Sequence, residues 1–95
     1  MVIQHKKSEG GGKGIFFVGA DGALLAELVY SMPTSNKMII EHTEVDESLA
    51  GQGVGLKLVS TAVEFARQQG IRIIPLCPFA KALFDKKPEW KDVHI

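Results

Sequence analysis

The segment EVDESLAGQGVGLKLV, residues 44–59, runs from acidic residues through three alternating glycines into an apolar stretch. Glycine within a regular element costs about 0.5–1 kcal/mol in backbone entropy relative to alanine. Three such residues at 51, 53 and 55 therefore call for an interaction that offsets this cost. The interaction that best suits glycine is a ligand that must approach the backbone closely.

A helix is predicted to begin directly after the glycines. Apolar residues recur every three or four positions from Val54 to Gln69, and Gly70 suits the helix C-terminus. The first turn of a helix presents free N–H groups at the positive end of its dipole, which favours a phosphate there. The P-loop and Rossmann patterns both fail, because each requires a glycine where this chain has Leu56 or Leu58. The alternative is that the glycines serve only a tight packing turn.

Four strands and two helices are predicted for the chain. The strands are 15–18, 23–31, 38–45 and 71–77, the helices are 54–69 and 78–87, and residues 8–14 are a glycine-rich loop. Short turns make the first three strands an antiparallel meander, whereas the helical crossover makes the fourth strand parallel to the third. Pro75 has no N–H to donate, so pairing of the fourth strand should be incomplete near its C-terminal end. We expect a single α+β domain over residues 1–95.

Composition excludes several classes of function. The chain has 11 basic and 11 acidic residues, so it lacks the basic balance typical of nucleic-acid binding. No apolar run is long enough to span a membrane, and the N-terminus lacks the apolar core of a secretory signal. The single cysteine cannot form an internal disulfide, which favours a reducing, cytoplasmic location. The three histidines show no spacing typical of a metal site.

Residues 42–56, HTEVDESLAGQGVGL, resemble the pyrophosphate-binding motif of the GNAT superfamily of acetyl-CoA-dependent N-acetyltransferases. More narrowly, the chain resembles a minimal branch of fewer than a hundred residues. HTEV, GQGVG, IIPLCPF and PEW occur here in the order and at the spacing of that branch, and the resemblance covers about residues 15–93. The chain departs from the superfamily at Ala50, where a glutamine or arginine is common.

The resemblance implies a binding mode for acetyl-CoA, with an acceptor that the sequence does not identify. The pyrophosphate would contact the amides of Gly51, Gln52, Gly53, Val54 and Gly55, and Lys57 would assist. The pantetheine arm would lie between the third and fourth strands and pair with the backbone from Thr43 to Val45. We also count Phe79 among the cofactor-binding residues, although a phenylalanine on a helix is more often part of the core.

Two residues are candidates for the chemistry of acetyl transfer. The pleat of strand 38–45 predicts that His42 shares a face with Met38 and Ile40, and Cys77 precedes a helix N-terminus, which favours the thiolate. If the two strands are neighbours, His42 and Cys77 could face each other as a base and a nucleophile. His42 could then serve direct attack by an amine, or Cys77 could take the acetyl group first.

Each assignment has an alternative. Cys77 could be a small buried hydrophobe, and His42 a hydrogen-bonded structural residue. Glu41 and Glu44 flank His42 and could tune it, although we expect them to remain solvated. For the chain as a whole, the alternatives to an acetyltransferase are a CoA-binding module without turnover and an interaction domain.

Overall fold

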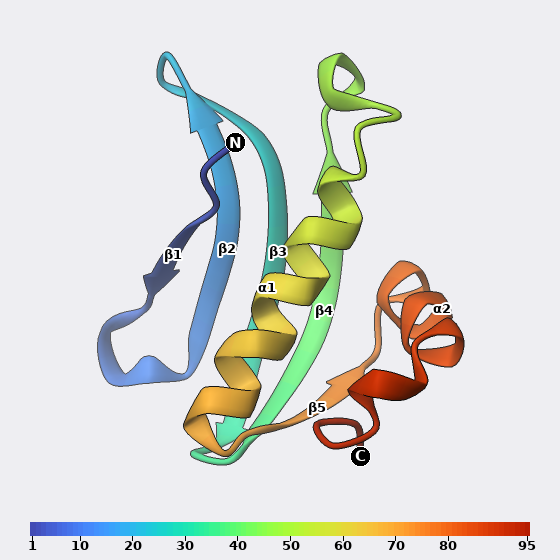
Figure 1. The fold of residues 1–95 in the computed structure, drawn as a ribbon. Helices are drawn as coiled ribbons and strands as arrows, with labels where there is room; N and C mark the ends of the chain where they lie inside the picture. Colours follow the sequence, from blue (N-terminus) through green and yellow to red (C-terminus); the bar gives the residue numbers. More distant parts are fainter.

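The computed structural model describes all 95 residues and contains one five-stranded sheet with two helices (Figure 1). The strand order follows the chain order, from β1 to β5. The elements are β1 (Gln4–Lys7), β2 (Lys13–Ala20), β3 (Ala23–Thr34), β4 (Lys37–Val45), α1 (Val54–Gln69), β5 (Arg72–Pro75) and α2 (Pro78–Lys86), with short 3₁₀ turns at Glu9–Gly11, Glu47–Leu49 and Pro88–Trp90.

The predicted topology is confirmed. Strands β2, β3 and β4 pair antiparallel in sequence order, and β5 pairs parallel to β4. Ile40 opposite Pro75 is the last pair of the parallel ladder, so pairing stops at the proline as expected. The helix α1 has the predicted bounds, between Gly53 and Gly70, which both have positive φ angles.

The sequence did not predict β1, and the predicted strands 15–18 and 23–31 are shorter than β2 and β3. β1 has the polar sequence QHKK and pairs antiparallel with β2 at the edge of the sheet. His5 is its main attachment to the interior: its ring stacks on Phe16 at 4.1 Å, and its Nε2 lies 2.6 Å from the Tyr30 hydroxyl. Lys13 and Gly14, predicted in a loop, belong to β2. An apolar pattern cannot reveal a strand that is held mainly by one histidine.

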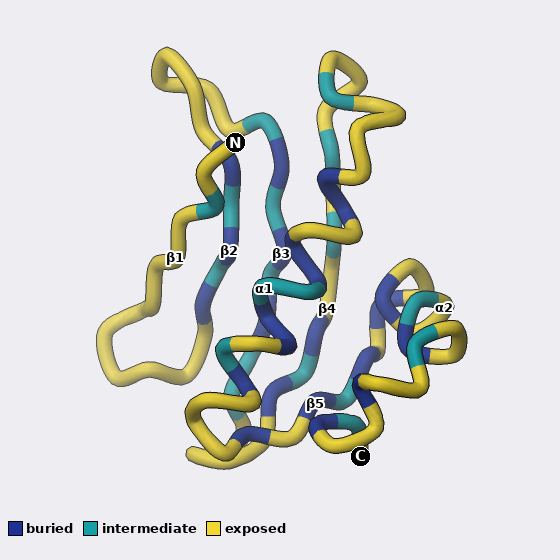
Figure 2. The backbone as a smooth tube through the Cα atoms, viewed as in Figure 1, coloured by how far each residue is buried: buried dark blue, intermediate teal, exposed yellow.

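The core lies between the sheet and the helices, and Figure 2 shows buried residues alternating along the strands. Its sheet side is formed by alternate residues of β2 to β5, and its helix side by the apolar stripe of α1 together with Ala80 and Phe84 of α2. The opposite face of the sheet carries no helix (Figure 1), and residues such as Val29 and Ile39 are only half-buried there. This one-sided arrangement leaves the far face accessible.

The C-terminal segment closes the outer edge of β5. The carbonyl of Ile73 accepts from the Ile95 amide at 3.1 Å, and the Trp90 side chain is buried. Arg67 of α1 binds Asp92 with two hydrogen bonds, at 2.7 and 2.8 Å. These contacts hold the C-terminal segment against β5 and α1.

No helix of the protein is both long and apolar enough to cross a membrane.

The contact between β2 and β3 predicts that alanine substitutions at two nearby glycines change the free energy of unfolding by different amounts. A Cβ on Gly14 would collide with the ring of Tyr30, which is 1% exposed and cannot move aside, whereas a Cβ on Gly12 would meet nothing within 4 Å. We expect Gly14→Ala to lower the free energy of unfolding by about 1–3 kcal/mol, as overpacking does. Gly12→Ala should change it by no more than about 0.5 kcal/mol. Urea titrations measure both, and equal effects would contradict this placement of Tyr30.

Candidate functional site

The site is built where β4 and β5 part. The Ile40 carbonyl accepts hydrogen bonds from the amides of Leu76 (3.1 Å) and Cys77 (2.9 Å), and these are the last main-chain bonds between the two segments. From there β4 continues to Val45 without a partner on this side, while the chain after β5 turns away into α2 (Figure 1). We call residues 41–45 on this side the unpaired edge of β4.

The main-chain groups of Thr43 and Val45 lie on the unpaired edge. The Asp46 amide donates to Leu25 of β3 at 2.7 Å, so its neighbour Val45 must present its N–H and C=O to the opposite side. The Thr43 amide likewise lies near the Cys77 sulfur and stabilises its thiolate. This edge therefore offers donors and acceptors to an extended ligand that lies where a strand would otherwise pair.

A β-bulge at Glu41 changes which face each side chain occupies. Tyr30 pairs with Ile40 and Val29 with His42, so Glu41 has no partner and the alternation shifts by one residue. Thr43 now lies opposite the buried Leu28, on the helix-covered face. His42 lies on the far face, with 53% of its side chain exposed.

The expectation that His42 and Cys77 face each other is therefore wrong. The pleat of a regular strand would have placed His42 with Met38 and Ile40, but the extra residue moves it to the far face. Cys77 belongs to the core cluster on the helix-covered face. The two side chains lie on opposite sides of β4, with Thr43 adjacent to His42 in sequence and in contact with Cys77.

Cys77 occupies the N-cap position of α2, and only 6% of it is exposed. Its Sγ lies 3.6 Å from the Thr43 hydroxyl. Burial raises the pKa of the thiol, but hydrogen bonds from the amides of Ala80, Phe79 and Thr43 and from the Thr43 hydroxyl more than offset this, so the pKa is lowered overall. The site thus stabilises the thiolate relative to that of a free cysteine in water.

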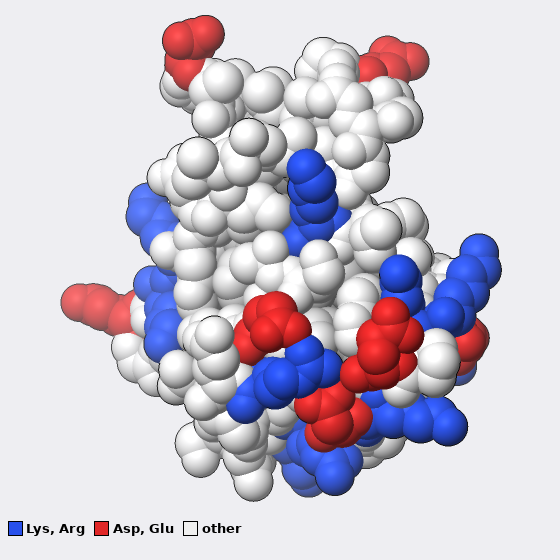
Figure 3. All heavy atoms as spheres, in the orientation of Figure 1, with Lys and Arg blue, Asp and Glu red and all other residues white.

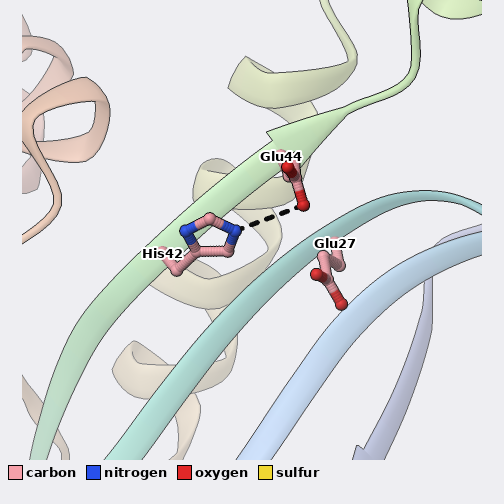
Figure 4. A group of neighbouring side chains, drawn as sticks. All are labelled: Glu27, His42 and Glu44. Atoms are coloured by element: carbon pink, nitrogen blue, oxygen red, sulfur yellow. Dashed lines mark hydrogen bonds and ion pairs between the residues drawn. The ribbon is translucent and has the colours of Figure 1, made fainter.

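His42 belongs to a group of three polar side chains on the far face. Its Nε2 lies 3.3 Å from Oε2 of Glu44, and Figure 4 shows Glu27 of β3 beside this pair. One potential ligand atom from each of the three residues lies within 4.8 Å of the others. Glu44 remains exposed, as expected, with 69% of its side chain accessible to solvent, and it also contacts His42.

Gly51 and Gly53 provide the open backbone predicted for a phosphate site. Their φ angles are +78° and +71°, and a Cβ on either would meet nothing within 4 Å. The first main-chain bond of α1 runs from the Lys57 amide to the Gly53 carbonyl, at 3.0 Å. Consequently the amides of Gly51, Gly53, Val54, Gly55 and Leu56 donate no hydrogen bond within the chain.

Gly55 has a different role. Its φ is not in the left-handed region, and a Cβ there would lie 2.6 Å from Cζ of Phe79, the second residue of α2. Gly55 is therefore needed for the close approach of the first turns of α1 and α2. The sequence pattern treated the three glycines as equivalent, because only the tertiary structure brings Phe79 to this helix.

Charge is distributed unevenly over the helix-covered surface. Figure 3 shows an isolated basic side chain over the N-terminal half of α1, whereas acidic and basic side chains are mixed over the C-terminal half of α1 and over α2. Lys57 lies on the first turn of α1 and is exposed, without an ion pair. Asp46 is used locally, since its carboxylate accepts from the Ser48 amide at 3.0 Å and caps the turn before the glycines. The surface near the free amides therefore suits an anion.

The environment of Cys77 predicts how its reactivity depends on Thr43. Thr43→Val removes the hydroxyl near Sγ and should raise the thiol pKa, so less thiolate is present at neutral pH. We expect alkylation by iodoacetamide at pH 7 to slow about threefold or more, since hydrogen bonds to charged groups contribute about 1.5–3 kcal/mol at full strength. Thr34→Val, on the exposed end of β3, is the control. An unchanged pH profile of alkylation would show that Thr43 does not stabilise the thiolate.

Comparisons with known proteins agree with this geometry. Residues 15–93 match the profile of the family described as GCN5-related N-acetyl-transferase. A GCN5-like protein from Staphylococcus aureus, described as a candidate N-acetyltransferase, has a solution structure that matches with a TM-score of 0.70 and 37% identity. That match covers 97% of this chain and 87% of the other. A sequence comparison with curated proteins found no match.

Larger proteins share the fold at lower identity. A GNAT family acetyltransferase from Elizabethkingia anophelis, crystallised with acetyl-CoA, matches with a TM-score of 0.58 and 14% identity over 80% of this chain and 52% of its own. A candidate streptothricin acetyltransferase from Bacillus anthracis, in complex with acetyl coenzyme A, matches with a TM-score of 0.56 and 21% identity over 80% of this chain and 46% of its own. The family profile and the Staphylococcus aureus structure together show that the chain belongs to the GCN5-related N-acetyltransferase family.

Proposed function

We propose that the protein transfers an acetyl group from acetyl-CoA to an amine acceptor. One observation carries this proposal: the unpaired edge of β4 leads from the free amides at the start of α1 to the point where Cys77 and His42 lie on either side of the strand. Binding groups for an anion, for an extended chain and for the reacting centre thus follow one another along a single edge.

The residues present fit coenzyme A. The segment from Gly51 through Gln52, Gly53 and Val54 to Gly55 would hold the pyrophosphate on its free amides, and Lys57 would add a positive charge. The Thr43 and Val45 backbone would pair with the pantetheine amides, in the manner of a strand added to a sheet edge. Phe79 would border the pyrophosphate site, because its ring already lies against Gly55.

The thioester would supply an activated acetyl group and a thiolate leaving group. In the direct route, the nitrogen of the amine attacks the carbonyl carbon, the carbon–sulfur bond breaks, and His42 takes the ammonium proton. In the covalent route, the Cys77 thiolate accepts the acetyl group and then passes it to the amine. Cys77 and His42 lie on opposite faces of β4, which favours separate roles for them. Cys77 would lie on the cofactor side and His42 on the acceptor side.

Acetyl-CoA in the crystal structures of two neighbours with this fold supports the choice of cofactor. The alternative function is a CoA-binding module without turnover. It is favoured by size, because the chain spans only about half the length of those two neighbours, with 52% and 46% of their chains covered. The far face also carries no helix that could enclose an acceptor (Figure 1).

Calorimetric titration with acetyl-CoA tests where the cofactor binds. Gly53→Glu should abolish the binding heat, because the side chain blocks the free amides and its charge repels phosphate. Gly22→Glu is a matched control: Gly22 also has a positive φ, of +78°, and open space around it, but it lies in the turn between β2 and β3. No binding by the folded wild-type protein, or equal loss in both variants, would refute the proposed cofactor site.

Variants of Cys77 and His42 separate the two routes. In the covalent route, wild-type protein mixed with acetyl-CoA alone should gain the mass of one acetyl group, and Cys77→Ala should lose both this adduct and turnover. In the direct route, Cys77→Ala should retain turnover while His42→Ala slows it by about 10²–10⁴-fold, the usual contribution of a general base. Release of CoA with an amine present measures turnover. If no amine raises that release above background, the binding-module alternative holds.

A further inference from the structure

We infer that Glu44 is a positioning residue that fixes the tautomer of His42, so that Nδ1 of the ring is the atom that accepts the proton from the acceptor amine. This inference rests on the proposed function for the role of His42. The tautomer of His42 depends only on the contact between the Glu44 and His42 side chains, and it can be tested without any turnover.

The hydrogen bond between His42 and Glu44 sets the tautomer of the imidazole ring. His42 and Glu44 are two residues apart on β4 and therefore point to the same face of the sheet. Nε2 of His42 lies 3.3 Å from Oε2 of Glu44 (Figure 4). An ionised carboxylate can only accept hydrogen bonds, so Nε2 must carry the hydrogen. Neutral His42 is then the Nε2–H tautomer, with its free lone pair on Nδ1.

The free lone pair on Nδ1 points away from Glu44. In Figure 4 the second ring nitrogen lies on the side of the imidazole away from Glu44, over the edge of β4 on the side where α2 lies. This is the unpaired edge of β4, along which the pantetheine arm is proposed to bind. The tautomer set by Glu44 therefore directs the basic nitrogen toward the proposed position of the reacting centre.

Glu44 also interacts with the positive charge that the His42 ring gains on proton transfer. When Nδ1 takes a proton from the ammonium group, the neutral amine keeps the electron pair that attacks the carbonyl, and the ring becomes an imidazolium. The same Nε2–H bond to Glu44 then becomes a charge-assisted bond, which is stronger than the neutral one. Glu44 would thus both select the tautomer and stabilise the product of proton transfer.

Glu27 offers a matched control for this role. It lies directly opposite Glu44 in the β3–β4 pairing, and its carboxylate belongs to the same group of three side chains. It makes no hydrogen bond to His42. Loss of Glu27 therefore removes a similar negative charge from the neighbourhood of the ring and leaves the hydrogen bond that sets the tautomer in place.

Nitrogen-15 NMR of the His42 ring, on folded protein without acetyl-CoA, tests the tautomer. The spectra are recorded with EDTA, because the three side chains could also hold a divalent cation. We expect the Nε2–H form to predominate in the wild-type protein and in Glu27→Ala, and a mixture of tautomers in Glu44→Ala. Predominance of Nδ1–H in the wild type, or the same change in both variants, would overturn the inference. If Glu44→Ala fails to fold, Glu44→Val gives the same comparison, because valine also removes the hydrogen-bond acceptor.

Kinetics test the consequence for proton transfer. Glu44→Ala should lower kcat about tenfold or more, which is part of the ~10²–10⁴-fold that a general base contributes, with KM for acetyl-CoA unchanged. Glu27→Ala should retain kcat. An unchanged kcat in Glu44→Ala, in a wild type that turns over, would refute the catalytic role. If the wild type shows no turnover, the proposed function fails, and the NMR comparison still decides the tautomer.

Discussion

The end of pairing between β4 and β5 is the constraint on which the rest of the site depends. Two amides after β5 donate to the same Ile40 carbonyl, and no further main-chain bond joins the segments. Two neighbouring strands that stop pairing are normally unfavourable, since the main-chain N–H and C=O groups beyond that point lose their partners. Here those groups are available to a ligand.

The two sides of β4 carry different chemistry because of one inserted residue. The bulge at Glu41 turns Thr43 toward the core and His42 toward the far face. Thr43 then helps stabilise the Cys77 thiolate, while His42 meets Glu44 and Glu27. A cofactor bound from the helix-covered side and an acceptor approaching from the far face would meet at this strand. The fold leaves the far face free for that approach, because both helices pack on the other side.

The glycine segment serves two physical purposes. Gly51 and Gly53 provide positive φ angles and open space next to free amides, whereas Gly55 allows Phe79 to pack against α1. The second purpose links the first turns of α1 and α2, and so couples the proposed phosphate site to the helix that begins at Cys77. The C-terminal contacts of Arg67 with Asp92 support this arrangement from the other end of α1.

The sequence by itself determined the order of the predicted elements, the parallel β4–β5 pair and the bounds of α1. Each of these follows from local periodicity, glycine and proline, which act within a few residues. Only the tertiary structure decided the presence of β1, the roles of Gly55 and Glu44, and the faces of His42 and Cys77. A polar edge strand and a β-bulge leave no hydrophobic signal, because both depend on contacts with residues far away in the chain: His5 with Tyr30, and His42 opposite Val29.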